Sequence, residues 1–102
     1  GEDPLAAANR ELMEEVGYGA RCLQHLNTLS LAPGYFEHVT QIILARDLYP
    51  KRLAGDEPED IEVVPWRLDA LPDLVAREDC TEALSIAALF LAMEAIKREG
   101  AF

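Results

Sequence analysis

The order of local patterns along the chain predicts an α/β or α+β fold. An amphipathic helical pattern runs over residues 3–16, β-branched and apolar residues fill 36–47, and a second helical pattern occupies 81–99. A helix followed by strands and then by further helices excludes an all-helical domain. Of the 102 residues, 50% are hydrophobic and 27% are charged, a composition typical of a globular domain.

The first helix is predicted from Asp3 to about Val16. Asp3 suits the N-cap, and Pro4 suits the first helical turn, where an N–H group has no partner within the helix. Gly17 is the expected stop signal, because glycine readily adopts the conformation that ends many helices. The expected buried face consists of apolar residues at three- and four-residue spacing: Leu5, Ala8, Leu12 and Val16.

Two or more strands are predicted after this helix. Residues 20–31 permit one or two short strands, and residues 36–47 form the best strand of the chain, ended by Tyr49-Pro50. Apolar or β-branched residues occur on both alternating faces of this second strand, so we expect both faces to be covered. A further short strand is expected over residues 61–66, where Pro65 places its end at an edge.

Two helices complete the predicted order. A short helix is expected over residues 69–76, and a longer one from about Thr81 to Glu99. Asp79 or Thr81 is the expected N-cap of the longer helix, and Gly100 is its expected terminator. We expect its inner face to pack on the sheet, with a dimer surface as the alternative. That face consists of Leu84, Ala87, Ala88 and Leu91.

The net charge of −10 restricts the classes of partner. Nineteen acidic side chains oppose nine basic ones, so the chain lacks the basic surface that non-specific nucleic-acid binding requires. No apolar run reaches the roughly 18 residues of a transmembrane helix, so no membrane partner is expected. Cys22 and Cys80 form no CxxC pair, which disfavours a disulfide framework or a zinc site and favours a reducing, cytoplasmic compartment.

The densest cluster of charge lies in the first helix. On a helical wheel at about 100° per residue, Glu11 and Glu15 fall one turn apart beside the buried face, with Glu14 flanking them. Three carboxylates within about 100° of arc repel one another unless they are solvated or bridged by a cation. Oxygen ligands at this density suit Mg²⁺ or Mn²⁺. The alternative is a solvated helix face on which Arg10 and Glu14 form an ion pair.

The spacing of these residues resembles the Nudix box, G-x5-E-x7-R-E-U-x-E-E-x-G-U, in which U is apolar. Glu2 is followed after seven residues by Arg-Glu-Leu-Met-Glu-Glu-Val-Gly-Tyr over residues 10–18, so every fixed position from the first glutamate onward is filled. The leading glycine of the pattern would precede residue 1. A match over this many fixed positions is far more specific than a short motif.

The resemblance implies the Nudix fold, an α/β/α sandwich around a mixed sheet, and hydrolysis of nucleoside diphosphates linked to another moiety. By position, Glu11, Glu14 and Glu15 resemble ligands of Mg²⁺, with Mn²⁺ as an alternative ion, and Glu11 and Glu14 are also expected to be catalytic. Glu2 and Arg10 resemble supporting residues that orient these carboxylates.

A proline downstream of the box resembles a feature of the Nudix hydrolases that act on ADP-ribose and ADP-sugars. Pro33 lies 16 residues after Gly17, the spacing at which that branch of the family has a proline. Pro33 is therefore a candidate for the substrate side of the site. An ordinary turn at residues 32–35 explains the same residues and is compatible with this role.

An acidic loop supplies the candidate general base. Residues 55–63 read Gly-Asp-Glu-Pro-Glu-Asp-Ile-Glu-Val, which is similar to the segment that carries the base in ADP-ribose hydrolases. Glu57 is the matched position, and Glu59 is the next candidate, also on the substrate side. A carboxylate here would accept the proton of a water that attacks phosphorus. The alternative is a surface loop without catalytic function.

The resemblance extends nearly end to end and is nearest to the bacterial ADP-compounds hydrolase group of the family. It implies metal-dependent hydrolysis of ADP-ribose, ADP-sugars, NADH or adenosine dinucleotides to AMP, by a homodimer in the intact protein. Residues 1–102 would then be the C-terminal part of a single domain, weakly active or inactive alone. The alternatives are another Nudix specificity, such as a nucleoside-triphosphate or RNA 5′-end pyrophosphohydrolase, and a non-catalytic Nudix-derived binding module.

Overall fold

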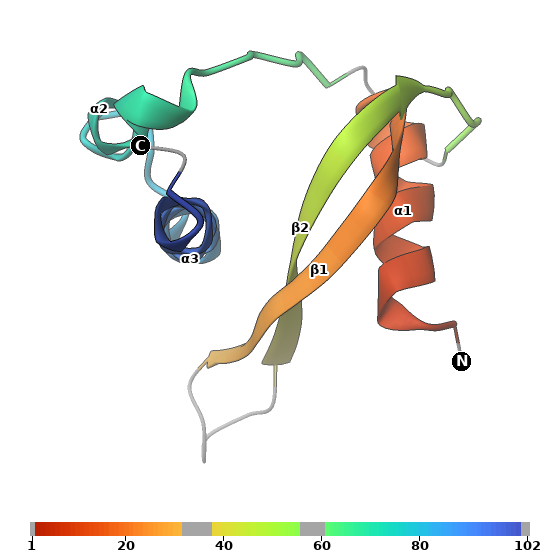
Figure 1. Ribbon diagram of the computed structural model, residues 1–102, viewed down its shortest axis with the longest axis horizontal. Helices are drawn as coiled ribbons and strands as arrows, with labels where there is room; N and C mark the ends of the chain where they lie inside the picture. The colour runs from red at the N-terminus through yellow and green to blue at the C-terminus, as the bar shows by residue number, and fades with distance from the viewer. Residues whose placement is uncertain (1, 32–37, 56–60, 101–102) are drawn as a thin grey trace. The chain divides into compact units, whose positions relative to one another are not determined.

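The computed structural model describes residues 2–31, 38–55 and 61–100. In these ranges the chain forms three α-helices, one 3₁₀ helix and two β-strands (Figure 1). It divides into two units, Gly1–Val63 and Val64–Phe102. The first contains a helix and a two-stranded antiparallel sheet, and the described part of the second is helical. The α+β class predicted from the sequence is confirmed.

Helix α1 spans Pro4–Glu15 and matches the prediction closely. The carboxylate of Asp3, the N-cap residue, accepts a hydrogen bond from the Ala6 N–H at 3.3 Å. Gly17 follows the helix with φ +84°, the left-handed conformation that glycine adopts without a steric penalty. The predicted apolar residues of α1 are half-buried, and the helix packs along the sheet (Figure 1).

The sheet is one long antiparallel hairpin. Strand β1 spans Tyr18–Leu31 and strand β2 spans His38–Pro50. Tyr18 pairs with Pro50 at one end, and Leu31 pairs with His38 at the other. Of the two possibilities that the sequence leaves open for residues 20–31, the structure shows one continuous strand. The register shifts at Leu26, which is the extra residue of a β-bulge in β1.

The expectation that both faces of the second strand are covered is wrong. Ile42 is buried at 8% exposure, but Val39 is 56% exposed and Leu48 is 47% exposed. Within the described part of the first unit, α1 is the only helix, and one helix covers one face of a hairpin. The apolar residues of β2 therefore supply more surface than the unit itself buries.

The second unit contains the two predicted helical segments. A 3₁₀ helix, η1, spans Leu68–Ala70, and α2 follows over Leu71–Val75. Helix α3 spans Ala83–Arg98 and ends before Gly100, which adopts φ +81°. In the described ranges, no helix combines the length and the apolar character that crossing a membrane requires.

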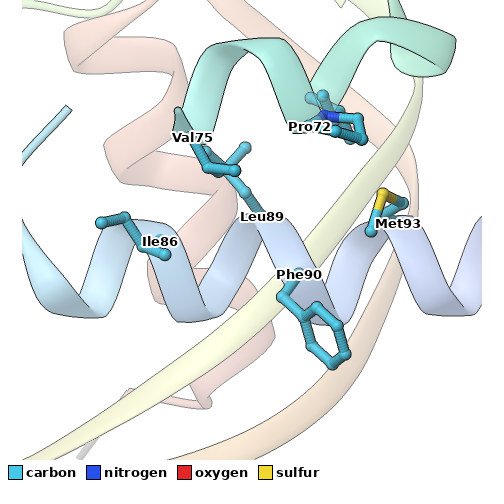
Figure 2. A pocket seen from close by; sticks show the side chains of 7 residues that line it. Pro72, Val75, Ile86, Leu89, Phe90 and Met93 are labelled. Carbon is cyan, nitrogen blue, oxygen red and sulfur yellow. The ribbon is translucent and has the colours of Figure 1, made fainter. Parts of the chain in front are cut away.

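An apolar groove of about 160 Å³ lies between α2 and α3. Figure 2 shows side chains of both helices around it. Leu71, at 6% exposure, is the buried residue of α2, and Phe90 on α3 is 56% exposed. The groove is lined by Leu71, Pro72, Val75, Ile86, Leu89, Phe90 and Met93.

The predicted N-cap of the long helix is wrong. Glu82 is the N-cap of α3, and its carboxylate accepts hydrogen bonds from the N–H groups of Leu84 at 2.7 Å and Ser85 at 3.1 Å. Asp79 instead accepts two hydrogen bonds from Arg77, both at 2.8 Å. Thr81 lies two residues before the helix begins, outside the N-cap position.

The predicted strand over residues 61–66 is also wrong, because these residues form no regular secondary structure. The described part of the chain forms a sheet of β1 and β2 alone, which offers this segment no paired neighbour. Residues 61–66 therefore have β-branched side chains but lack the cross-strand contacts that stabilise a strand. The segment ends at Trp66, whose indole N–H donates to the Ala70 carbonyl at 2.7 Å.

Candidate active site

The candidate site is the C-terminal half of α1. Glu11, Glu14 and Glu15 lie there, Glu11 exposed and the other two half-buried. Across residues 2–31, 38–55 and 61–100, no three Asp, Glu, His or Cys side chains are grouped as a metal site requires. The donor chemistry fits Mg²⁺, because three carboxylates share one end of a helix, although they are not gathered into one coordination sphere.

Arg10 connects two of the predicted site residues. Its guanidinium donates to Glu2 through Nη2 at 3.0 Å and through Nε at 3.3 Å, and to Glu14 through Nη1 at 3.1 Å. The hydrogen bond with Glu2, and next the one with Glu14, raise the pKa of Arg10. Arg10 thus forms ion pairs with both Glu2 and Glu14. The pair with Glu14 would also be expected on a solvated helix face, whereas the pair with Glu2 joins two positions of the Nudix box.

Residues 51–55, which we call the strap, cover the C-terminal end of α1. The Lys51 N–H donates to the Gly17 carbonyl at 3.0 Å, and the Leu53 N–H donates to the Met13 carbonyl at 3.2 Å. Carbonyl groups at the end of a helix have no partner within the helix. Leu53 supplies such a partner to Met13, and Lys51 bonds to Gly17 just beyond the helix, because the pairing of β2 with β1 places residue 51 beside the helix end.

Two strap residues contact Glu14. Arg52 Nη1 donates to the Glu14 main-chain carbonyl at 2.6 Å. A Cβ atom added to Gly55 would lie 3.0 Å from Glu14 Cβ and 3.5 Å from its Oε2, so the strap backbone lies against this side chain. Glu14 is thus contacted from the strap on both its main chain and its side chain, and the side chain is 19% exposed.

Asn9 joins α1 to the sheet, a role that the sequence analysis did not assign. Its Oδ1 accepts a hydrogen bond from the Ala20 N–H at 2.9 Å, and Ala20 is buried. On the helical wheel Asn9 falls about 40° from Leu5, inside the apolar face. A polar side chain on a buried face requires a hydrogen-bond partner, so the sequence did carry a signal for this contact.

The contacts of Arg52 and Gly55 were also missed, and for them the sequence carries no local signal. Both residues lie far from α1 along the chain and reach it through the register of the hairpin. Arg52 belongs to no motif that the sequence analysis recognised, and the acidic segment that begins at Gly55 gave no sign of a contact with α1. Only the pairing of β1 with β2 reveals that the strap contacts the helix end on which the candidate site lies.

The two candidate bases, Glu57 and Glu59, lie outside the described residues. Gly55, the last described residue before them, contacts the side chain of Glu14. The last described residue before the two candidate bases therefore lies beside Glu14.

Pro33, the candidate on the substrate side, also lies outside the described residues. The described residues on either side of that segment are Leu31 and His38, which pair at the end of the hairpin opposite to Tyr18. At about 3.3 Å per residue, β1 separates Leu31 from Tyr18 by about 40 Å. The structure thus does not bring these two flanking residues to the carboxylates.

Comparison with known proteins shows similarity along the chain. The model of the NUDIX domain matches residues 1–87. The ADP compounds hydrolase NudE of Escherichia coli (strain K12) is 49% identical over 100 residues, which cover 98% of this chain and 54% of that relative. The ADP-ribose pyrophosphatase of Bacillus subtilis (strain 168) is 36% identical over 81 residues, which cover 76% of this chain and 44% of that relative.

A solved structure shows the same similarity. The crystal structure of an ADP compounds hydrolase superposes with a TM-score of 0.94 at 48% identity, and the match covers 100% of this chain and 55% of that one.

A third sequence relative has a different name. The methanol dehydrogenase activator of Bacillus methanolicus is 34% identical over 71 residues, covering 68% of this chain and 38% of that relative. The chain spans about half the length of the first relatives it matches.

Proposed function

The chain belongs to the NUDIX family, and on this premise we propose that it carries the catalytic helix of a pyrophosphohydrolase for ADP-linked compounds. The proposed substrates are ADP-ribose, ADP-sugars, NADH and adenosine dinucleotides, with AMP as a product. Similarity to an ADP compounds hydrolase and to an ADP-ribose pyrophosphatase supports this substrate class. The proposal excludes nucleic acid and membranes as partners.

One observation carries the proposal: the central residues of the box lie on one folded helix, and Arg10 of that helix contacts two other box residues. Arg10 holds both Glu2 and Glu14, and the strap closes the end of the same helix. A chance charge run on a solvated face would not require the contact with Glu2, eight residues before Arg10. The pattern and the geometry therefore support the same assignment.

We assign the roles on α1 as follows. Glu11, Glu14 and Glu15 are the residues that would hold Mg²⁺, or Mn²⁺, which when bound neutralises pyrophosphate charge and lowers the pKa of water. Arg10 restrains the Glu14 carboxylate, and Glu2 restrains Arg10. This chain of contacts limits the rotation of the Glu14 side chain, which is the contribution that residues behind metal ligands usually make.

Glu57 is our candidate for the general base, with Glu59 as the second candidate. The contact of Gly55 with Glu14 supports this assignment, because Glu57 follows Gly55 by two residues and consecutive Cα atoms are about 3.8 Å apart. Pro33 remains a candidate for the substrate side of the site, on the resemblance alone.

The resemblance also implies a homodimer and a cytoplasmic location, which we include in the proposal. Sedimentation equilibrium tests the dimer.

The test is AMP release from ADP-ribose by the full-length gene product. We expect turnover with Mg²⁺ or Mn²⁺ and none with EDTA. Glu15→Gln, which removes one charge and keeps the side-chain shape, should lower kcat by about 100-fold or more, since it removes a ligand rather than a residue behind one. Glu78→Gln is the matched control, because Glu78 is an exposed glutamate outside α1, and it should retain wild-type turnover.

Three results would contradict the proposal in different ways. Unchanged turnover in Glu15→Gln would remove the metal assignment. Hydrolysis of nucleoside triphosphates or of triphosphorylated RNA, without hydrolysis of ADP-ribose, would replace the substrate class. A well-folded protein that binds ADP-ribose but hydrolyses no member of the panel would be a binding module.

A further inference from the structure

We propose that Arg52 is a positioning residue for Glu14, acting through the main chain of α1 and through the strap. The inference rests on the proposed function in one respect, which is that Glu14 is treated as a ligand for a divalent cation. It adds a residue outside the box to the machinery of the site. Its basis is the set of contacts between residues 51–55 and the end of α1.

The end of α1 combines two unfavourable electrostatic features. The C-terminus of a helix carries partial negative charge, and here the same end also carries Glu14 and Glu15. The last turn of α1 contains no basic residue of its own. Arg52 brings a cation to this point from another element, and its hydrogen bond to the Glu14 carbonyl measures 2.6 Å. A short bond from a charged donor is stronger than a neutral one.

The Arg52 guanidinium lies beside Gly17. A Cβ atom at Gly17 would lie 3.5 Å from Arg52 Cζ, Nε and Nη2, which is ordinary contact distance, so the guanidinium lies directly on this glycine. Arg52 thus touches the chain on both sides of the helix end, at residue 14 and at residue 17. The planar group of arginine suits such a position better than the ammonium of lysine.

We call the contacts of Arg52 with Glu14 and Gly17 the Arg52 clamp, and this clamp also positions the Glu14 side chain. Main-chain bonds flank Arg52 on both sides: Leu53 bonds to Met13 in α1, and Lys51 bonds to Gly17 just after the helix. Gly55 follows and lies against Glu14 Cβ and Cγ, at 3.0 Å and 3.4 Å from the position of an added Cβ. Loss of the Arg52 clamp should let Gly55 move away and let Glu14 adopt other rotamers.

Four variants of the full-length gene product test this inference. Arg52→Ala removes the clamp, and Lys51→Ala is the charge-matched control, because it removes the neighbouring cation and keeps the main-chain bond to Gly17. Gly55→Ala changes no charge but introduces the close contact with Glu14. Arg52→Lys keeps the charge without the planar group.

Two measurements separate positioning from simple structural support. The first is the dissociation constant of Mn²⁺, measured by titration calorimetry without substrate, and the second is hydrogen exchange of the Leu53 amide. We expect Arg52→Ala to weaken Mn²⁺ binding about tenfold, the lower end of the usual range for residues behind metal ligands. Gly55→Ala should weaken it in the same direction, Arg52→Lys should recover part of the affinity, and Lys51→Ala should stay within twofold. Exchange at Leu53 should accelerate in Arg52→Ala.

The outcomes distinguish this inference from the proposed function. Unchanged exchange at Leu53 in Arg52→Ala would overturn the clamp, whatever the protein hydrolyses. Faster exchange with unchanged Mn²⁺ affinity would reduce Arg52 to a structural role and overturn the positioning of Glu14. A wild-type protein that binds no Mn²⁺ would overturn the metal assignment and the positioning role, while the exchange rates would still show whether Arg52 holds the strap.

Discussion

Helices α1 and α3 are held in place by different kinds of contact. Directional hydrogen bonds from other elements reach α1 along its length, to the side chain of Asn9 and to the carbonyl groups of its last turn. Helix α3 contacts α2 through apolar side chains such as Leu89 and Met93 (Figure 2). Directional bonds fix the rotation of a helix about its axis, whereas apolar packing tolerates adjustment. The helix with the candidate site is the one that receives directional bonds from other segments.

The largest expected effect on stability concerns the apolar contact between α2 and α3. Leu71→Ala should lower the free energy of unfolding by about 2–4 kcal/mol, because Leu71 is 6% exposed and its removal leaves a cavity beside α3. Trp66, the single tryptophan of the chain, lies in the same unit, so its fluorescence during urea titration reports the change.

Leu68→Ala is the control for this prediction. Leu68 lies three residues earlier and is 50% exposed, so we expect a change within about 0.5 kcal/mol. Equal losses in the two variants would show that apolar burial does not decide the stability of this unit.

The intermediate effect concerns the hydrogen bond that joins α1 to the sheet. Asn9→Ala should lower the free energy of unfolding by about 1–3 kcal/mol, because the Ala20 N–H, in a buried residue, loses its acceptor. Hydrogen exchange at Ala20 should accelerate. Asn9→Asp keeps an acceptor oxygen and should behave more like the wild type. Wild-type exchange at Ala20 in Asn9→Ala would mean that the rotation of α1 is fixed by other contacts.

The smallest expected effect concerns the N-cap of α3, where a carboxylate caps an apolar helix. The hydrogen bond from the Leu84 N–H, and further bonds from Ser85, lower the pKa of Glu82 below its usual value. A lowered pKa in the folded state means that the cap stabilises the protein fully above the usual carboxyl pKa and loses its effect as pH falls through the lowered value. Glu82→Gln should therefore lower Tm by a few degrees near neutral pH.

The difference in Tm between wild type and Glu82→Gln should shrink in strong acid. Differential scanning calorimetry over a pH series measures it. A difference that stays constant down to the lowest pH would show that the charge of Glu82 does not contribute to the cap.

Helix α1 was predictable because its signals are local. Asp3, Pro4 and Gly17 mark its ends within a few residues, and helical periodicity alone relates Glu11 to Glu15. The expected N-cap of α3 was wrong although it too was a local prediction, because the helix begins at Ala83 and Glu82 takes the capping position, while Asp79 accepts hydrogen bonds from Arg77. Competition between partners is not visible in a list of residue preferences.

The parts of the fold and of the site that could not be predicted depend on contacts between segments that lie far apart in the sequence. The segment 61–66 has the residues of a strand but no neighbouring strand in the described chain. Coverage of β2 was overestimated because composition shows which residues are apolar but not how many layers lie against them. The role of Arg52 depends on the opposition of Pro50 and Tyr18, which no local pattern encodes.

The bulge at Leu26 has a consequence for how this hairpin can evolve. β1 has 14 residues and β2 has 13, and the bulge absorbs the difference within the hairpin. The extra residue at position 26 is thus accommodated while Tyr18 stays opposite Pro50. A change of strand length at the bulge can therefore leave the pairing beside the end of α1 in place.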